Sequence, residues 1–391
     1  MSNPIERDVT RWLNAESSGV SSLGSDVGVE RALFLDLRSD EAFQIQRLEH
    51  SVNIPFSALQ PSLYLLPPRT RPFAIILDSQ IDAQKQLQVL CADFKGHTWT
   101  VTGAFVGDHE FFITCSILRD ERVSVQSGVI SFQSMKRLWE PSSALERWLP
   151  RCEPPNMDSV AVFDDAPDRM ERCRRAPVCV DLGSGVGRDA VWAARRGWRV
   201  VAIDSDQKGL DRCARLAKES GVGGMVSCVR MNLGEGHTCT DVTSASSEDL
   251  LRLVLEPLGL HLSGVCAVYA VRFLHKPLVC SLAHALPPGA SLLWFHFMRG
   301  CENTVVGRPS KDKDLLENGE LLDAVMAVTV TYSSSSCCST DEPFSSNAVC
   351  PWDVLVDDVL SLPDGRPISE FVAVKKTRTD NNVILVGDFA H

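Results

Sequence analysis

The sequence lacks several features that mark whole classes of protein. No apolar run reaches the roughly 18 residues that cross a bilayer, so we expect no membrane span. The first residues, MSNPIERDVTRWLNAE, contain acids and no apolar segment, which is unlike a secretory signal. Basic residues are in deficit, with 39 lysines and arginines against 50 aspartates and glutamates and a net charge of -11. We therefore expect a cytoplasmic protein that binds neither a membrane nor a long nucleic acid.

The cysteines show no metal or disulfide pattern. The chain has 14 of them, but no CxxC pair and no cysteine–histidine cluster with the spacing of a zinc site. Several, such as Cys179, Cys266 and Cys280, lie inside apolar runs. This distribution predicts reduced, buried thiols and no bound metal.

The length and composition favour more than one domain. A chain of 391 residues that is 44% hydrophobic can bury two cores or more. Residues 1–120 contain the strand patterns FLDL, FAIIL and TVTGAF with helical patterns between them, which predicts a small α/β domain. Residues 121–176 are rich in proline and charge, with a short helix pattern after Pro141, and are expected to form a connector. Residues 377–391 are expected to form a tail.

Residues 177–376 predict a second α/β domain. Strand and helix patterns alternate there, which is typical of a parallel, Rossmann-like sheet. In PWDVLVDDVLSLPDGRPISEFVAVKK, at 351–376, two strand patterns meet at the turn signal PDGRP, so we expect the sheet to end in an antiparallel hairpin. The expected parallel strands are 178–181, 199–204, 225–231, 264–271 and 291–298.

The stretch VCVDLGSGVGRDAVWAA, at 178–194, places glycines on alternate positions after a short apolar strand. A dinucleotide-binding loop has the spacing G-x-G-x-x-G, but here the third glycine, Gly187, falls one position early. With Asp181 two residues before Gly183, the spacing D-x-G-x-G-x-G resembles that of class I methyltransferases, which bind S-adenosylmethionine (SAM). SAM has no phosphate. Asp181 can act on its amino-acid end through a water or a main-chain group, and the glycines allow close backbone approach.

Two further strand ends fit the same cofactor. Asp204 ends the next predicted strand and can accept both ribose hydroxyls. Asn232, in VRMNL, stands at the end of the third predicted strand and is placed to form a hydrogen bond with the edge of the adenine. The predicted cofactor-binding residues are Asp181, Gly183, Ser184, Gly185, Gly187, Asp204, Ser205 and Asn232.

Residues 177–376 as a whole resemble a class I SAM-dependent methyltransferase. The resemblance implies a seven-stranded sheet, with the reversed last strand in the hairpin, and SAM as cofactor. More narrowly, DLGSGVGRDAVWAA, VRFLHKPLVCSLAHALPPGASLLWFHFMRG and VGRP with LLENGEL resemble the tellurite-resistance-type methyltransferases, some of which are fused to a rhodanese-like domain. That family usually has cysteine where this chain has Ser184.

Residues 31–115 resemble a rhodanese domain through FLDLRSDEAFQIQRLEHSVNIPFSAL and TVTGAF. A working rhodanese carries a cysteine in the loop after its central strand, where backbone amides stabilise the persulfide. Here Asp78 takes that position and Ala83 that of the usual arginine, while Cys91 lies in the following helix pattern. The resemblance therefore implies a domain without sulfurtransferase activity that serves docking, stability or substrate presentation, with a protein partner as one option.

The methyl acceptor is expected beyond the carboxyl ends of the parallel strands. Positioning can dominate the rate of an in-line displacement at a sulfonium, so the chemistry demands no particular general base. The candidates on this side are Arg272 and His275, after the fourth strand, and His296, in the fifth. Each has a plainer interpretation: Arg272 as a surface ion pair, His275 as a helix cap and His296 as a core histidine.

Three functions follow from the sequence. The first is methyl transfer from SAM to a small-molecule or protein nucleophile, with no nucleic acid as acceptor. The second is a non-catalytic SAM-binding scaffold or sensor of the same fold. The third is a nicotinamide-dependent oxidoreductase, which the glycine spacing disfavours.

Overall fold

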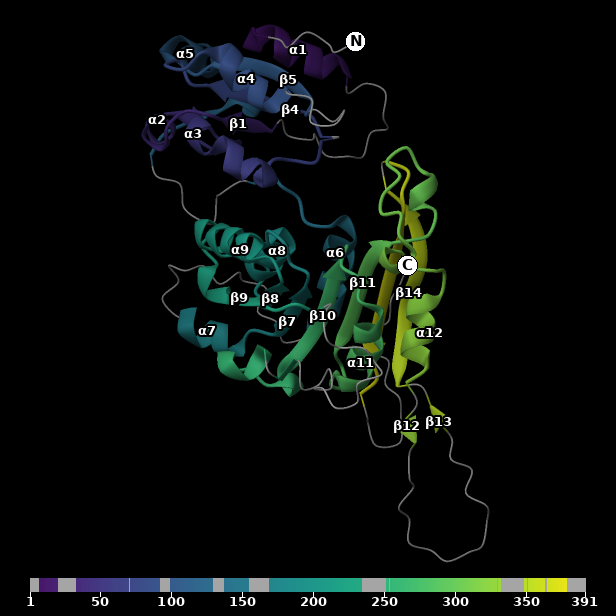
Figure 1. Cartoon of the computed structure of the whole chain (residues 1–391). Coiled ribbons are helices and arrows are strands. Elements are labelled where there is room, and N and C mark those ends of the chain that lie inside the picture. The colour runs from purple at the N-terminus through teal and green to yellow at the C-terminus, as the bar shows by residue number, and fades with distance from the viewer. Residues whose placement is uncertain are drawn as a thin grey trace, which may run out of the picture. The chain divides into compact units, whose positions relative to one another are not determined.

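The structure is a computed structural model that divides the chain into two compact units, Met1–Glu140 and Pro141–His391 (Figure 1). In the described part of the chain, no helix has both the length and the apolar character needed to cross a membrane. The boundary between the units falls inside the predicted connector, so the two parts of that segment belong to different units. The described residues are 7–19, 33–69, 71–91, 99–128, 137–154, 169–233, 251–252, 254–328, 330–331, 348–349, 351–362 and 364–377.

The first unit is built on a parallel sheet with the strand order β3-β1-β4-β5. All five residues of β4, FAIIL, are buried, because buried clusters cover the sheet on both faces. The strands are β1 Phe34–Asp36, β3 Ser51–Asn53, β4 Phe73–Leu77 and β5 Val101–Val106, with β2 Arg47–Leu48 paired to β6 Val125–Gln126. The helices are α1 Val9–Gly19, α2 Asp40–Ile45, α3 Phe56–Leu59, α4 Ala83–Cys91 and α5 His109–Leu118.

The second unit contains, within its described residues, a seven-stranded sheet of order β14-β15-β11-β10-β7-β8-β9. The five strands from β11 to β9 in this order are parallel, which confirms the α/β class, and β15 and β14 are antiparallel. The strands are β7 Val178–Leu182, β8 Arg199–Asp204, β9 Val226–Arg230, β10 Val265–Val271, β11 Ser291–Phe297, β14 Trp352–Ser361 and β15 Pro367–Lys375. A separate ribbon pairs β12 Val330–Thr331 with β13 Ala348–Val349.

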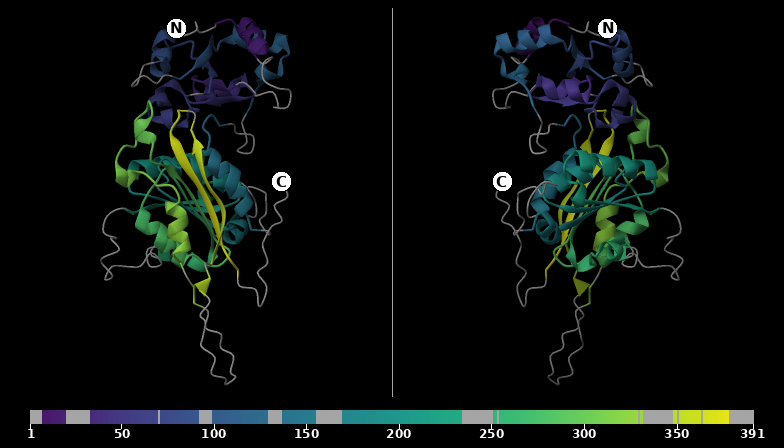
Figure 2. Two further views of the ribbon diagram at one scale, coloured as in Figure 1. Left: turned by 90° about the vertical axis from the view of Figure 1, so that its right-hand side faces the viewer. Right: turned by 90° about the vertical axis from the view of Figure 1, so that its left-hand side faces the viewer.

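Helices cover both faces of this sheet (Figure 2). Cys228 of β9 interacts with Cys213 of α9, whereas the next residue, Val229, packs into the buried cluster that contains Leu282 of α11. Because successive strand residues point to opposite faces, α9 and α11 lie on opposite sides. The helices are α6 Ser143–Trp148, α7 Arg169–Arg175, α8 Arg188–Arg195, α9 Gln207–Glu219, α11 Lys276–Ala285 and α12 Glu320–Met326.

The short helix after Pro141 is an integral part of the second unit. Arg147 of α6 forms an ion pair with the buried Glu370 of β15, at 2.9 Å between Nη1 and Oε2. The backbone N–H of Ser142 donates to Oδ1 of Asp189 in α8, at 2.7 Å. These contacts fix residues 141–152 against the sheet, so this part of the predicted connector is not a free linker.

Candidate functional site

The glycine loop follows β7 and has a left-handed backbone at each of its glycines, with φ of 72° at Gly183, 55° at Gly185 and 78° at Gly187. A Cβ at Gly187 would lie 2.1 Å from Sγ of Cys213, and one at Gly183 would lie 2.6 Å from Cβ of Phe273. A Cβ at Gly185 would meet no atom of the described residues within 4 Å. Packing therefore requires the first and third glycines, whereas Gly185 borders open space.

Asp204 joins this loop to the end of the neighbouring strand. Its Oδ2 accepts from the N–H of Gly185 at 2.7 Å, and its Oδ1 accepts from the N–H of Asp206 at 2.8 Å. The N–H groups of Gly183 and Ser184 both donate to the carbonyl of Ile203, at 2.9 and 3.0 Å. The residue predicted as a ribose acceptor thus also holds the loop in shape.

A buried carboxyl lies under the loop. Asp181 is 2% exposed, and its Oδ2 has no hydrogen-bond partner among the described residues. Among the described residues, neither Ser184 Oγ nor the hydroxyl of Tyr269 has a partner within hydrogen-bond distance. Tyr269 stands opposite Asp181 in the register of β7 and β10, and its hydroxyl acts to lower the pKa of Asp181. Burial raises the pKa of Asp181 well above its ordinary value, and the charge of nearby Asp189 raises it further. This group of atoms fits a ligand that brings positive charge and hydrogen-bond donors.

The remaining predicted cofactor residues lie at the adjoining strand ends. Ser205 directly follows β8 and Asn232 lies two residues beyond β9, and both are exposed. The N–H of Met231 donates to the carbonyl of Asp204 at 2.9 Å, which ties these two ends together. The structure therefore brings all the predicted cofactor residues to the carboxyl edge of β7, β8 and β9, where open α/β sheets bind ligands.

The acceptor-side candidates differ in their surroundings. Arg272 follows β10, is exposed and has no carboxylate within ion-pair distance among the described residues. His275 occupies the N-cap position of α11, but its side chain makes no capping hydrogen bond. His296 is 5% exposed and its Nε2 lies 3.1 Å from the carbonyl of Asp314, as expected for a core histidine. Burial lowers the pKa of His296, so its ring is neutral near pH 7.

Sequence reasoning missed the residues that close the site from other segments. Phe273 packs over Gly183, and Tyr269 lies beside Asp181. Both belong to β10 or its following loop, about 90 residues along the chain from the glycine motif. The only local signal was that VRFLHK directly follows a predicted strand.

In the first unit, the loop after β4 satisfies its own polar groups. Gln86 is fully buried, accepts from the N–H of Asp78 and donates to the carbonyls of Asp78 and Ile81, each at 2.9 Å. Among the first-unit cysteines whose side chains the structure describes, Cys115 is buried, and burial raises its pKa to about 12. The side chain of Cys91 lies outside the described residues. These features are unlike a thiolate site.

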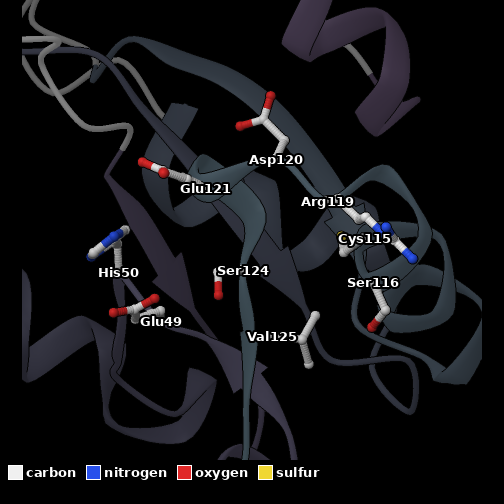
Figure 3. Close-up of a pocket in the computed structure, with 9 residues that line it drawn as sticks. All are labelled: Glu49, His50, Cys115, Ser116, Arg119, Asp120, Glu121, Ser124 and Val125. Atoms are coloured by element: carbon white, nitrogen blue, oxygen red, sulfur yellow. The ribbon is translucent and has the colours of Figure 1, made fainter.

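Cavities also lie among the described residues of the first unit. One, of about 480 Å³, extends over the ends of β4 and β5 and includes Leu77 and Val106. Another has a volume of about 540 Å³. In Figure 3, Glu49 and His50 stand on one side of it and Cys115, Ser116 and Arg119 on the other. Neither includes a residue of the predicted SAM site.

Comparison with known proteins bears on the second unit. Residues 180–245 match the family model of a methyltransferase domain. An uncharacterized protein of Schizosaccharomyces pombe is 26% identical over 187 residues, or 46% of this chain and 49% of that protein. The chain thus spans about half the length of the curated relative that it matches.

Solved structures give weaker similarities. TehB from Haemophilus influenzae is 11% identical, with a TM-score of 0.33, over 54% of this chain and 62% of that chain. An RNA methyltransferase from Salinibacter ruber is 16% identical, with a TM-score of 0.27, over 62% of this chain and 97% of that chain. Similarities this low indicate neither the fold nor the methyl acceptor. The family match, in contrast, covers the glycine loop and Asp204, so residues 180–245 of the second unit are similar in sequence to a methyltransferase domain.

Proposed function

We propose that the protein is an enzyme that transfers a methyl group from SAM to a nucleophile of a small molecule or a protein, at the carboxyl edge of β7, β8 and β10. The observation that carries this proposal is the orphaned carboxyl oxygen of buried Asp181 beneath the glycine loop. A carboxyl in that position is stabilised by a cationic ligand. SAM is a cation at two centres, its ammonium and its sulfonium, whereas a nicotinamide dinucleotide would place its anionic pyrophosphate against the glycine loop.

Each of the predicted cofactor-binding residues is assigned to one part of SAM. Asp181 and Ser184 face the amino-acid end, Asp204 and Ser205 the ribose, and Asn232 the adenine, while Gly183, Gly185 and Gly187 shape the backbone. Bound SAM supplies an activated methyl group on its sulfonium, which leaves by in-line displacement. The protein then has to hold the acceptor in line with that methyl group and exclude water. Arg272 and His275, after β10, are the proposed acceptor-side residues.

For the first unit, we propose a rhodanese-like domain over residues 1–120 that has lost sulfur transfer and serves docking or stability. Two observations support this assignment. The motif DLR forms a buried ion pair, with Arg38 Nη2 at 2.7 Å from Asp36 Oδ2, at the end of β1. The loop after β4 carries Asp78, which the sequence resemblance aligns with the cysteine of a rhodanese, and Gln86 is hydrogen-bonded to both the N–H and the carbonyl of Asp78 at 2.9 Å.

Replacement of Asp204 by alanine should lower SAM affinity by about tenfold or more in isothermal titration calorimetry. The variant loses the ribose acceptor and also leaves the N–H of Gly185 without its carboxylate acceptor. The affinity should fall because each hydrogen bond to a charged group contributes about 1.5–3 kcal/mol. Asp211→Ala, on the exposed side of α9, is the matched control and should bind SAM as the wild type does. Unchanged affinity in Asp204→Ala would refute the assignment of this edge as the cofactor site.

Purified protein should produce no thiocyanate from thiosulfate and cyanide. A carboxylate at Asp78 cannot carry a sulfane sulfur, and the described thiol of the first unit, Cys115, has a raised pKa and is buried. The measurement is a colorimetric thiocyanate assay with a working rhodanese as positive control. Thiocyanate formation that disappears when one cysteine is replaced would show that the loop has been assigned wrongly.

The overall proposal is tested with methyl-labelled SAM and a cell extract separated into small molecules, proteins and RNA. Label should enter the small-molecule or protein fraction with the wild type and not with Asp204→Ala. SAM binding without label transfer to any fraction would favour a non-catalytic SAM-binding protein. Transfer to RNA would contradict the expectation drawn from the acidic composition.

A further inference from the structure

Arginines from separate segments gather on the acceptor side of the second unit. Arg188 is the first residue of α8, Arg272 follows β10 and Arg366 directly precedes β15. The guanidinium carbons of Arg272 and Arg366 lie 5.7 and 4.5 Å from the centre of the same ring, that of Phe297. The charges of Arg188, Asp189 and Asp364 also act on Arg272. Three positive and two negative side chains therefore share one region.

The ion pairs and hydrogen bonds within this group do not neutralise all of its positive charge. Arg366 is bound to Asp364, at 2.7 Å between Nη2 and Oδ2, and donates to the carbonyl of Arg308 at 3.2 Å. Asp189 accepts from the N–H of Ser142. Among the described residues, neither Arg188 nor Arg272 has a carboxylate within ion-pair distance. Three arginines and two aspartates leave a net positive charge of one in this region, which a single bound anion would neutralise.

Arg272 is held in place rather than left free in solvent. Its φ is 58°, a left-handed conformation that arginine rarely adopts, and its N–H donates to the carbonyl of Phe295 at 2.7 Å. Its guanidinium carbon lies 5.7 Å from the centre of the Phe297 ring. The next residue, Phe273, packs against Gly183 of the glycine loop. Arg272 therefore stands immediately beside the proposed cofactor site.

We propose that Arg188 and Arg272 bind an anionic group of the methyl acceptor, a carboxylate or a phosphate, and thereby set the class of substrate. The planar guanidinium matches both groups with paired hydrogen bonds, and one anion would balance the charge of the cluster. This inference rests on the proposed methyltransferase function. The carboxylate of SAM offers the same chemistry, so the experiment separates the two sources.

The variants are Arg272→Gln and Arg188→Gln, with Arg215→Gln on the exposed side of α9 as a control of equal charge change. Calorimetry with SAM comes first. Both variants should bind SAM within about twofold of the wild type, because the arginines act on the acceptor. A tenfold loss of SAM affinity would instead assign them to the cofactor carboxylate and overturn the proposal. Failure of the wild type to bind SAM would refute the proposed function itself.

Label transfer from methyl-labelled SAM to the small-molecule fraction comes second, with products separated by anion exchange. The labelled product of the wild type should be retained on the column. When the amount of extract, and so of acceptor, limits the rate, both variants should incorporate label at least about tenfold more slowly than the wild type. This is the effect expected when a charge-assisted hydrogen bond between arginine and the acceptor anion is lost. Arg272→Lys, which keeps the charge but not the paired geometry, should recover part of the rate. Label in the unretained fraction, or wild-type rates in Arg272→Gln, would overturn the proposal.

Discussion

Replacement of Gly187 by alanine is expected to destabilise the second unit by about 2–5 kcal/mol and to abolish measurable SAM binding. The left-handed φ of 78° costs an alanine about 1–2 kcal/mol. Overpacking adds about 1–3 kcal/mol, because the new Cβ would lie 2.1 Å from Sγ of Cys213 and 3.0 Å from its Cα. Thermal unfolding followed by circular dichroism measures the first effect, and calorimetry with SAM measures the second.

The same substitution at Gly185 is the matched comparison. A Cβ there meets no atom of the part of the chain that the structure describes within 4 Å. Only the φ of 55° is then penalised, and the loss of stability should be about 1–2 kcal/mol. SAM affinity should nevertheless fall by about tenfold or more, since the methyl group would project into the space assigned to the cofactor. Normal SAM affinity in Gly185→Ala would show that the cofactor does not lie against this loop.

Most of the fold could be predicted because its signals are short in sequence. The apolar runs of β7 and β8, the turn PDGRP between β14 and β15, and the alternating glycines each occupy fewer than about ten residues, and local pattern predicts them well. The carboxyl edge of a parallel sheet then follows from topology alone. This was enough to bring Asp181, Asp204 and Asn232 to one edge.

The parts that could not be predicted depend on register and on distant packing. Tyr269 meets Asp181 only because β10 pairs with β7 in one particular register. Ser142 reaches Asp189 from a segment 47 residues earlier, which a proline-rich composition had suggested was a connector. The charge cluster around Arg272 likewise draws on α8 and on the start of β15. No local pattern encodes such contacts, so the acceptor side was the least predictable part of the site.

SAM binding is expected to release a proton from Asp181. Burial raises the pKa of this carboxyl in the cofactor-free protein, so it is protonated at pH values where an exposed aspartate would be ionised. A cationic ligand favours the ionised form and lowers the pKa again, which expels the proton. SAM affinity should therefore rise with pH through the window between the ordinary and the raised pKa, by at most about tenfold per pH unit for one proton, and level off above it.

The stability of the cofactor-free protein should change in the opposite direction. In the same window the folded state holds a proton that the unfolded state has lost, so stability falls as the pH rises. Asp181→Asn, which is neutral at every pH, should remove both dependences, whereas Asp211→Asn on exposed α9 should keep them.

Calorimetry in phosphate and in Tris, whose ionisation enthalpies differ, measures the released proton directly. The wild type should show a release of up to about one proton and Asp181→Asn none. At low pH the two proteins should bind SAM alike, because the carboxyl is then neutral in both, and their affinities should separate as the pH increases. A wild-type affinity independent of pH, or proton uptake on binding, would contradict the role of Asp181 as the buried acid that meets the cationic end of SAM.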